Sequence, residues 1–111
     1  MIAHISIGVK DIDRSKRFYD AALAPLGYKC IREAKTLVGH GYGAETIFLW
    51  VVAAERPVPA DEKSGLHFCF AALSEAAVDA FHAAALTAGG QDNGAPGLRP
   101  AYDPCVNLRQ L

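Results

Sequence analysis

Residues 2–9 alternate, with Ala3, Ile5, Ile7 and Val9 on one side and Ile2, His4, Ser6 and Gly8 on the other. A period of two predicts a strand. Asp11 or Asp13 can cap a following helix, and Pro25 and Gly27 are typical of its end. Three more strands are predicted at 28–33, 36–42 and 45–53, and the composition of 56–64 indicates a linker. The first unit is therefore βαβββ.

The chain carries an internal repeat. Segment 4–27 aligns without gaps on segment 67–90, and six of the 24 positions are identical, including His4/His67, Phe18/Phe81 and Gly27/Gly90. The repeat predicts a second strand at 65–71 and a second helix, which Ser74 caps and Gly89-Gly90 ends. Its tail is short and contains Pro96, Pro100 and Pro104, which exclude a paired sheet through most of that segment. We expect a single domain with a complete module at 1–62 and a shortened βα module at 63–111, without its last two strands.

Composition excludes several classes of protein. The net charge is −1 and there is no basic cluster, so nucleic acid is not expected as a partner. The longest apolar stretch, 47–54, is far shorter than the roughly 20 residues of a membrane span. Met1 runs directly into a strand, which argues against a secretory leader, and the three cysteines form no CxxC pair. These features predict a cytoplasmic protein with reduced thiols.

Each copy of the repeat places a histidine at the start of its first strand, beside small residues. Ser6 and Gly8 share a face with His4, while Cys69 and Ala71 share one with His67. A sheet face of this kind resembles the wall of a cavity. Either histidine alone is explained by half-burial with one hydrogen bond. Two at equivalent repeat positions favour a shared site, and we expect both to face one cavity.

Other side chains could complete a pocket for an aromatic or anionic ligand: Tyr42, Trp50, Arg99 and Tyr102. Trp50 is also explained as sheet core. A guanidinium on a loop can bind a carboxylate or phosphate, although a solvated loop residue is the favoured explanation for Arg99. His40 lies between Gly39 and Gly41, which favours a flexible strand or turn near the mouth of the site. No catalytic residue can be assigned from the sequence.

Several motifs together resemble the vicinal oxygen chelate superfamily of glyoxalases, bleomycin-resistance proteins and extradiol dioxygenases. They are His4-Ile-Ser-Ile-Gly-Val-Lys-Asp, the helix Ser15-Lys-Arg-Phe-Tyr-Asp ending in Leu26-Gly-Tyr28, Gly65-Leu-His67-Phe-Cys-Phe, and Gly94-Ala-Pro-Gly-Leu-Arg-Pro. The resemblance implies an α+β fold in which paired βαβββ modules form a cupped mixed sheet, here with the second module truncated.

The resemblance also implies a divalent metal, with His4 and His67 as two of its ligands. Imidazole nitrogen suits Zn²⁺, Ni²⁺, Mn²⁺ or Fe²⁺. The third ligand belongs on the strand 45–53, where Phe48, Leu49 and Trp50 cannot bind a metal. The fourth belongs on a final strand that this chain lacks. We therefore expect no metal held by four side chains of one chain.

These observations favour a protein that binds a small molecule in a sheet-lined cavity, as bleomycin-resistance proteins do. The alternatives are a metal-dependent lyase or dioxygenase, and a shortened form without activity. A homodimer is expected, because a truncated module leaves a sheet edge unpaired. The segment 105–111 could lie across that edge or on the partner chain.

Overall fold

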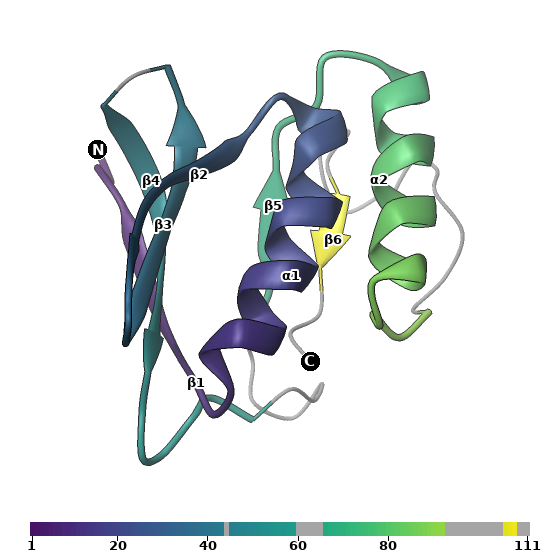
Figure 1. Cartoon of the computed structure of the whole chain (residues 1–111). Helices are drawn as coiled ribbons and strands as arrows, with labels where there is room; N and C mark the ends of the chain where they lie inside the picture. Colours follow the sequence, from purple (N-terminus) through teal and green to yellow (C-terminus); the bar gives the residue numbers. More distant parts are fainter. Residues whose placement is uncertain (44, 60–65, 93–105, 109–111) are drawn as a thin grey trace.

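The computed structural model describes residues 1–43, 45–59, 66–92 and 106–108 (Figure 1). A four-stranded sheet is formed by β1 (Ile5–Val9), β2 (Lys29–Ala34), β3 (Leu37–Tyr42) and β4 (Thr46–Ala53). The strand order is β1-β4-β3-β2, with β1 parallel to β4 and the other pairs antiparallel. The predicted βαβββ order of elements and the α+β fold class are confirmed.

One face of this sheet is covered by α1 (Ile12–Leu23), which continues into the short 3₁₀ helix η1 (Ala24–Leu26). Asp11 caps α1 by accepting a hydrogen bond from the backbone N–H of Arg14. The helix buries a stripe with the spacing of one helical face, formed by Ser15, Phe18, Tyr19, Ala22 and Leu23. That stripe packs against the sheet residues Ile7, Val9, Val38, Leu49 and Val51, which are almost fully buried. Each large side chain in this core contributes about 1.5–3 kcal/mol to stability.

The second copy of the repeat supplies β5 (Phe68–Phe70) and α2 (Glu75–Thr87). Ser74 caps α2 through a hydrogen bond from Ala77 N, as predicted, and Phe81 and Ala85 are its buried residues. In Figure 1, α1 lies between the four-stranded sheet and α2. The proposed module boundary at 62/63 lies outside the described residues.

The chain end does contribute a strand. β6 (Val106–Leu108) pairs antiparallel with β5, with Phe68 opposite Leu108 and Phe70 opposite Val106. Residues 106–108 of the segment 105–111 therefore lie along an edge of β5, one of the two positions expected for that segment. Backbone groups along that edge of β5 are paired within the chain.

The structure bears on two expectations, the redox state of the cysteines and the location of the protein in the cell. Cys30 is a free thiol, but Cys69 is disulfide-bonded, so the prediction that every cysteine is reduced is wrong for Cys69. Among the described residues, no helix is long and apolar enough to cross a membrane. A cytoplasmic location stays a prediction.

Candidate functional site

A pocket of about 250 Å³ opens between the first module and β5. Its walls combine one residue each from β1, the segment before β2, and β4 with a continuous run around β5: Ile5, Tyr28, Phe48, His67, Phe68, Cys69, Phe70 and Ala71. The volume lies just below the roughly 300–1,000 Å³ of typical small-molecule sites. The pocket therefore suits a small ligand.

Aromatic rings form most of the pocket wall. Ring centroids of Tyr28 and Phe48 lie 4.7 Å apart, and those of Phe48 and Phe70 lie 5.9 Å apart at 76°. These are separations of favourable aromatic pairs, so the wall is held in shape by its own packing. The Tyr28 hydroxyl donates a hydrogen bond of 3.3 Å to the carbonyl oxygen of Ala71, which ties the two modules across the pocket.

Burial raises the pKa of the Tyr28 phenol, and the nearby Tyr42 adds to the effect. The Tyr28 hydroxyl is therefore protonated at neutral pH and can act as a hydrogen-bond donor. His67 brings a polar imidazole beside the aromatic rings, in a lining whose exposed surface is polar and apolar in similar measure. A ligand with an apolar body and one hydrogen-bonding group matches this chemistry.

The residues predicted for the site are not all gathered around this pocket. His67 lines it, whereas His4 is exposed just before β1 and adjoins the lining residue Ile5. Tyr42 is 53% exposed and lies beside the pocket, its ring 5.9 Å from that of Tyr28. Arg99 and Tyr102 lie outside the described residues. That His4 and His67 face one cavity stays a prediction.

Trp50 is half-buried and lies opposite Ser6 in the β1–β4 register and opposite Gly39 in the β3–β4 register. A Cβ on Gly39 would meet the Trp50 ring at 2.9 Å, so the indole lies directly over that glycine. Leu49 and Val51, its neighbours along β4, are buried in the core beside α1. Alternation along the strand therefore places Trp50 on the sheet face away from α1. Its predicted ligand contact stays a prediction.

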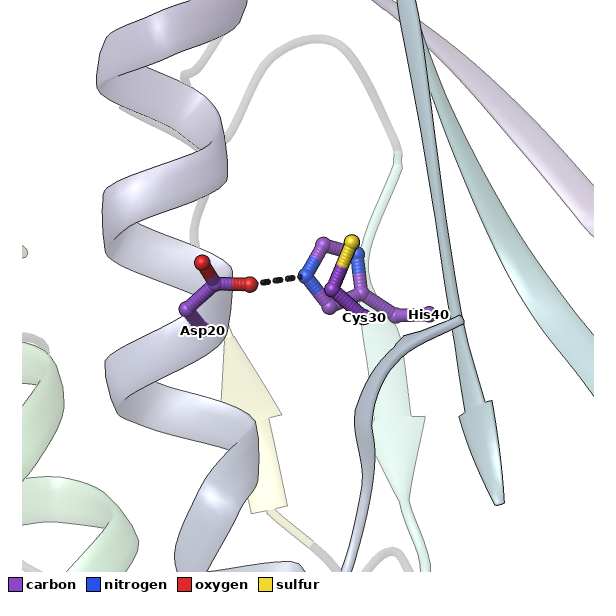
Figure 2. Close-up of side chains that lie close together, drawn as sticks. All are labelled: Asp20, Cys30 and His40. Atoms are coloured by element: carbon purple, nitrogen blue, oxygen red, sulfur yellow. Dashed lines mark hydrogen bonds and ion pairs between the residues drawn. The ribbon is translucent and has the colours of Figure 1, made fainter. Parts of the chain in front are cut away.

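A second cluster, formed by Asp20, Cys30 and His40, was not anticipated as a site. Figure 2 shows the carboxylate of α1 directed at the imidazole of β3, with the thiol of β2 beside the ring. The Asp20 Oδ1 accepts a hydrogen bond of 2.8 Å from His40 Nε2, and Lys16 Nζ contacts Oδ2 at 2.6 Å. His40 is completely buried, while Asp20 and Cys30 are partly exposed.

The charge states in the cluster follow from burial. Loss of solvent lowers the pKa of His40, and the hydrogen bond and charge of Asp20 oppose that effect without cancelling it. The imidazole is therefore neutral at neutral pH, with its proton on Nε2. Burial first and the Asp20 charge second raise the pKa of the Cys30 thiol, which donates to the carbonyl of Arg32 at 3.3 Å.

His40 also corrects the sequence interpretation. It does not lie in a flexible strand or turn at a site mouth; it is a fully buried residue within β3. Its flanking glycines are required by close packing, because a Cβ on Gly41 would lie 1.8 Å from the backbone oxygen of Thr46. The alternation of Val38 with His40, two residues apart, was the one local signal that both face the core.

The β-sheet register brings Cys30 and His40 together. The two residues are direct partners in the β2–β3 ladder, and directly opposed residues in an antiparallel pair have neighbouring side chains on one face. The β2–β3 register shifts between Cys30 and Arg32, and the β3–β4 register shifts between His40 and Gly41. Among the described residues, this cluster is the one group of three potential metal ligands whose donor atoms lie close together.

Comparison with known proteins identifies the chain's relatives. The family model described as "Glyoxalase/Bleomycin resistance protein/Dioxygenase superfamily" matches residues 1–103. A crystal structure of a glyoxalase/bleomycin resistance protein from Albidiferax ferrireducens T118 is 33% identical, with a TM-score of 0.73 over 87% of this chain and 80% of that one. None of the curated protein sequences matches this chain.

Proposed function

Because the chain belongs to the glyoxalase/bleomycin resistance protein/dioxygenase superfamily, we propose that it binds a small molecule in the pocket between its two modules. The observation that carries the proposal is the lining of that pocket. Aromatic rings from both modules surround a volume of about 250 Å³, and His67 offers one polar contact. Concave, mostly apolar sites with a few polar groups are the usual form of a small-molecule site.

The size and lining of the pocket define the ligand class. A single aromatic or heteroaromatic ring fills such a volume and can pack edge-to-face against Phe48 and Phe70. A hydroxyl or carbonyl on that ring can bond to the imidazole of His67. A large drug with several rings would have to extend into solvent.

Binding is favoured over metal-dependent catalysis by the donors that line this pocket. Of its described lining residues, Cys69 is held in a disulfide, and the other side chains that carry a potential metal-ligating atom are His67 and Tyr28. Three or four protein ligands are the norm for a retained metal. A lyase or dioxygenase centre at this position therefore requires further donors from residues that do not line it, or from a partner chain.

The test is direct binding of small aromatic probes to the purified protein. Phenol and indole should bind in calorimetric titration and raise the midpoint of thermal unfolding. Phe48→Ala should weaken binding because it removes a ring from the wall, whereas Leu73→Ala, a change at a side chain that is 98% exposed, should not. Equal binding by the two variants would show that the pocket is not the site.

A homodimer belongs to the same proposal. It is supported by the family, whose members are often dimeric. Two-fold pairing of identical chains is the commonest assembly of soluble oligomers. Light scattering at low micromolar concentration should give twice the chain mass of 11.8 kDa. A stable monomer would contradict the dimer and leave the ligand proposal intact.

A further inference from the structure

We infer that Asp20, Cys30 and His40 form a binding site for one divalent transition-metal ion of the zinc class, separate from the small-molecule pocket. The three donor atoms come from α1, β2 and β3 and all lie within 4.8 Å of one another. Ligands of one tetrahedral zinc ion are each about 2.0–2.3 Å from the metal. Small side-chain adjustments therefore bring all three within bonding distance of one ion.

The donor set selects the kind of metal. One carboxylate oxygen, one thiolate sulfur and one imidazole nitrogen are ligands of Zn²⁺ and Co²⁺, whereas Mg²⁺ and Ca²⁺ require oxygen. The charges also match, because Asp20 and an ionised Cys30 together neutralise a divalent ion. Binding breaks the S–H bond of Cys30 and releases that proton to solvent. The proton of His40 moves from Nε2 to Nδ1, so the imidazole stays neutral while Nε2 binds the ion.

Nε2 of His40, the ring nitrogen that faces Asp20, is the atom that would bind the ion. The side chain is fully buried, and its Nδ1 has no hydrogen-bond partner among the described residues. Buried polar atoms in native folds are nearly always paired, so Nδ1 requires a buried water as its partner when Nε2 holds the ion. Asp20 can bind a metal through Oδ1 while Oδ2 keeps its contact with Lys16, which holds the carboxylate in place.

The position of the cluster defines what the ion does. Asp20 lies on the helix and the other two residues lie on adjacent strands, so the metal would join α1 to the sheet. The side chains of Asp20 and Cys30 are partly exposed, which gives the ion a route from solvent. Three protein ligands leave a fourth position for water, as in open zinc sites.

The experiment titrates the metal-free protein with Co²⁺ and follows its absorption spectrum. A thiolate-to-cobalt charge-transfer band in the near ultraviolet, saturating at one ion per chain and displaced by Zn²⁺, is the expected result. Cys30→Ser should remove the band. Asp20→Asn should weaken Co²⁺ binding about 100-fold, because loss of a direct ligand should cost at least as much affinity as the largest losses caused by changing residues that only contact a ligand. Circular dichroism of each metal-free variant verifies that it folds.

Matched controls separate this site from the one that the repeat suggested. His4→Ala and His67→Ala should leave the cobalt band unchanged, because neither residue belongs to the cluster. No charge-transfer band in the folded wild-type protein, or a band that survives Cys30→Ser, would overturn the inference. Loss of the band in His4→Ala or His67→Ala with its retention in Asp20→Asn would also overturn it. Neither result bears on aromatic-probe binding, so this inference and the proposed function can fail separately.

Discussion

The Asp20 carboxylate accepts a hydrogen bond of 2.8 Å from Nε2 of His40, and this bond joins α1 to the middle of β3. The imidazole is fully buried, while the carboxylate side chain keeps 35% of its exposure. Water therefore reaches Asp20 but cannot replace the acid as a partner of the ring. The pair consequently contributes to stability in the metal-free protein as well as to the proposed metal site.

We predict that Asp20→Ala destabilises the metal-free fold by about 1–3 kcal/mol, because it leaves a buried N–H of His40 without an acceptor. Urea unfolding monitored by circular dichroism measures the change. Lys16→Ala is the matched control, since it removes the other partner of the same carboxylate at a partly exposed position. That surface ion pair is worth about 0–0.5 kcal/mol. Equal decreases in the free energy of unfolding for the two variants would show that the hydrogen bond to His40 adds no stability beyond that of the surface ion pair.

We predict that acid lowers stability through His40. Burial holds its pKa below the ordinary value of 6.5 in the folded chain, despite the opposing effect of Asp20, and the Lys16 charge lowers it further. The unfolded chain then binds the proton more readily, so this contribution is complete above the unfolded pKa and is lost as the pH falls below it. Urea unfolding at several pH values between about 8 and 5 measures the slope.

His40→Gln provides the comparison for that pH profile. Glutamine can still donate to Asp20 but does not titrate, so the variant should lose part of the pH dependence within this window. An unchanged profile in His40→Gln would assign the acid sensitivity to other groups.

Local periodicity predicted the order of the elements in the first module and the caps of both helices. The alternation of Ile5, Ile7 and Val9 indicates the buried face of the sheet. The apolar residues at helical spacing on α1 indicate the helix face that packs against it. These signals depend on neighbours within one turn or one strand. They do not depend on which strands pair.

The Asp20–Cys30–His40 cluster could not be read in that way. Its three members come from three elements, and they meet only because the β2–β3 register opposes Cys30 to His40 while α1 crosses that pair. Register shifts beside both residues are invisible to a period-two pattern. The glycines around His40 were misinterpreted for a related reason. Their small size serves contacts with β4, which are distant in sequence, and not chain flexibility.

We predict that Gly41→Ala is strongly destabilising, because its Cβ would lie 1.8 Å from the Thr46 oxygen, a backbone atom that cannot turn aside. Overpacking of this kind costs about 1–3 kcal/mol or more. Gly27→Ala is the comparison, because open space surrounds the new methyl group there. Its φ of +87° is unfavourable for alanine, so this substitution costs about 1–2 kcal/mol in backbone strain. Thermal unfolding should place Gly41→Ala below Gly27→Ala. A flexible turn at 39–41 would give the reverse order.

We predict, finally, opposite effects of removing the hydroxyl from two tyrosines. The Tyr19 hydroxyl is buried without a hydrogen-bond partner among the described residues, and burial raises its pKa, so the phenol stays neutral. Tyr19→Phe should leave stability unchanged or increase it by up to about 1 kcal/mol, because an unsatisfied polar group is removed while the ring still packs on Phe18.

Tyr28→Phe should instead lower stability by about 0.5–1.5 kcal/mol, the net value of one intramolecular hydrogen bond, because its hydroxyl donates to Ala71 across the pocket. Both changes delete the same atom and keep the same ring, so the difference isolates hydrogen bonding from packing. Urea unfolding at neutral pH measures both variants. If Tyr19→Phe proves the more destabilising of the two, the Tyr19 hydroxyl has a hydrogen-bond partner in the core, and the prediction is wrong.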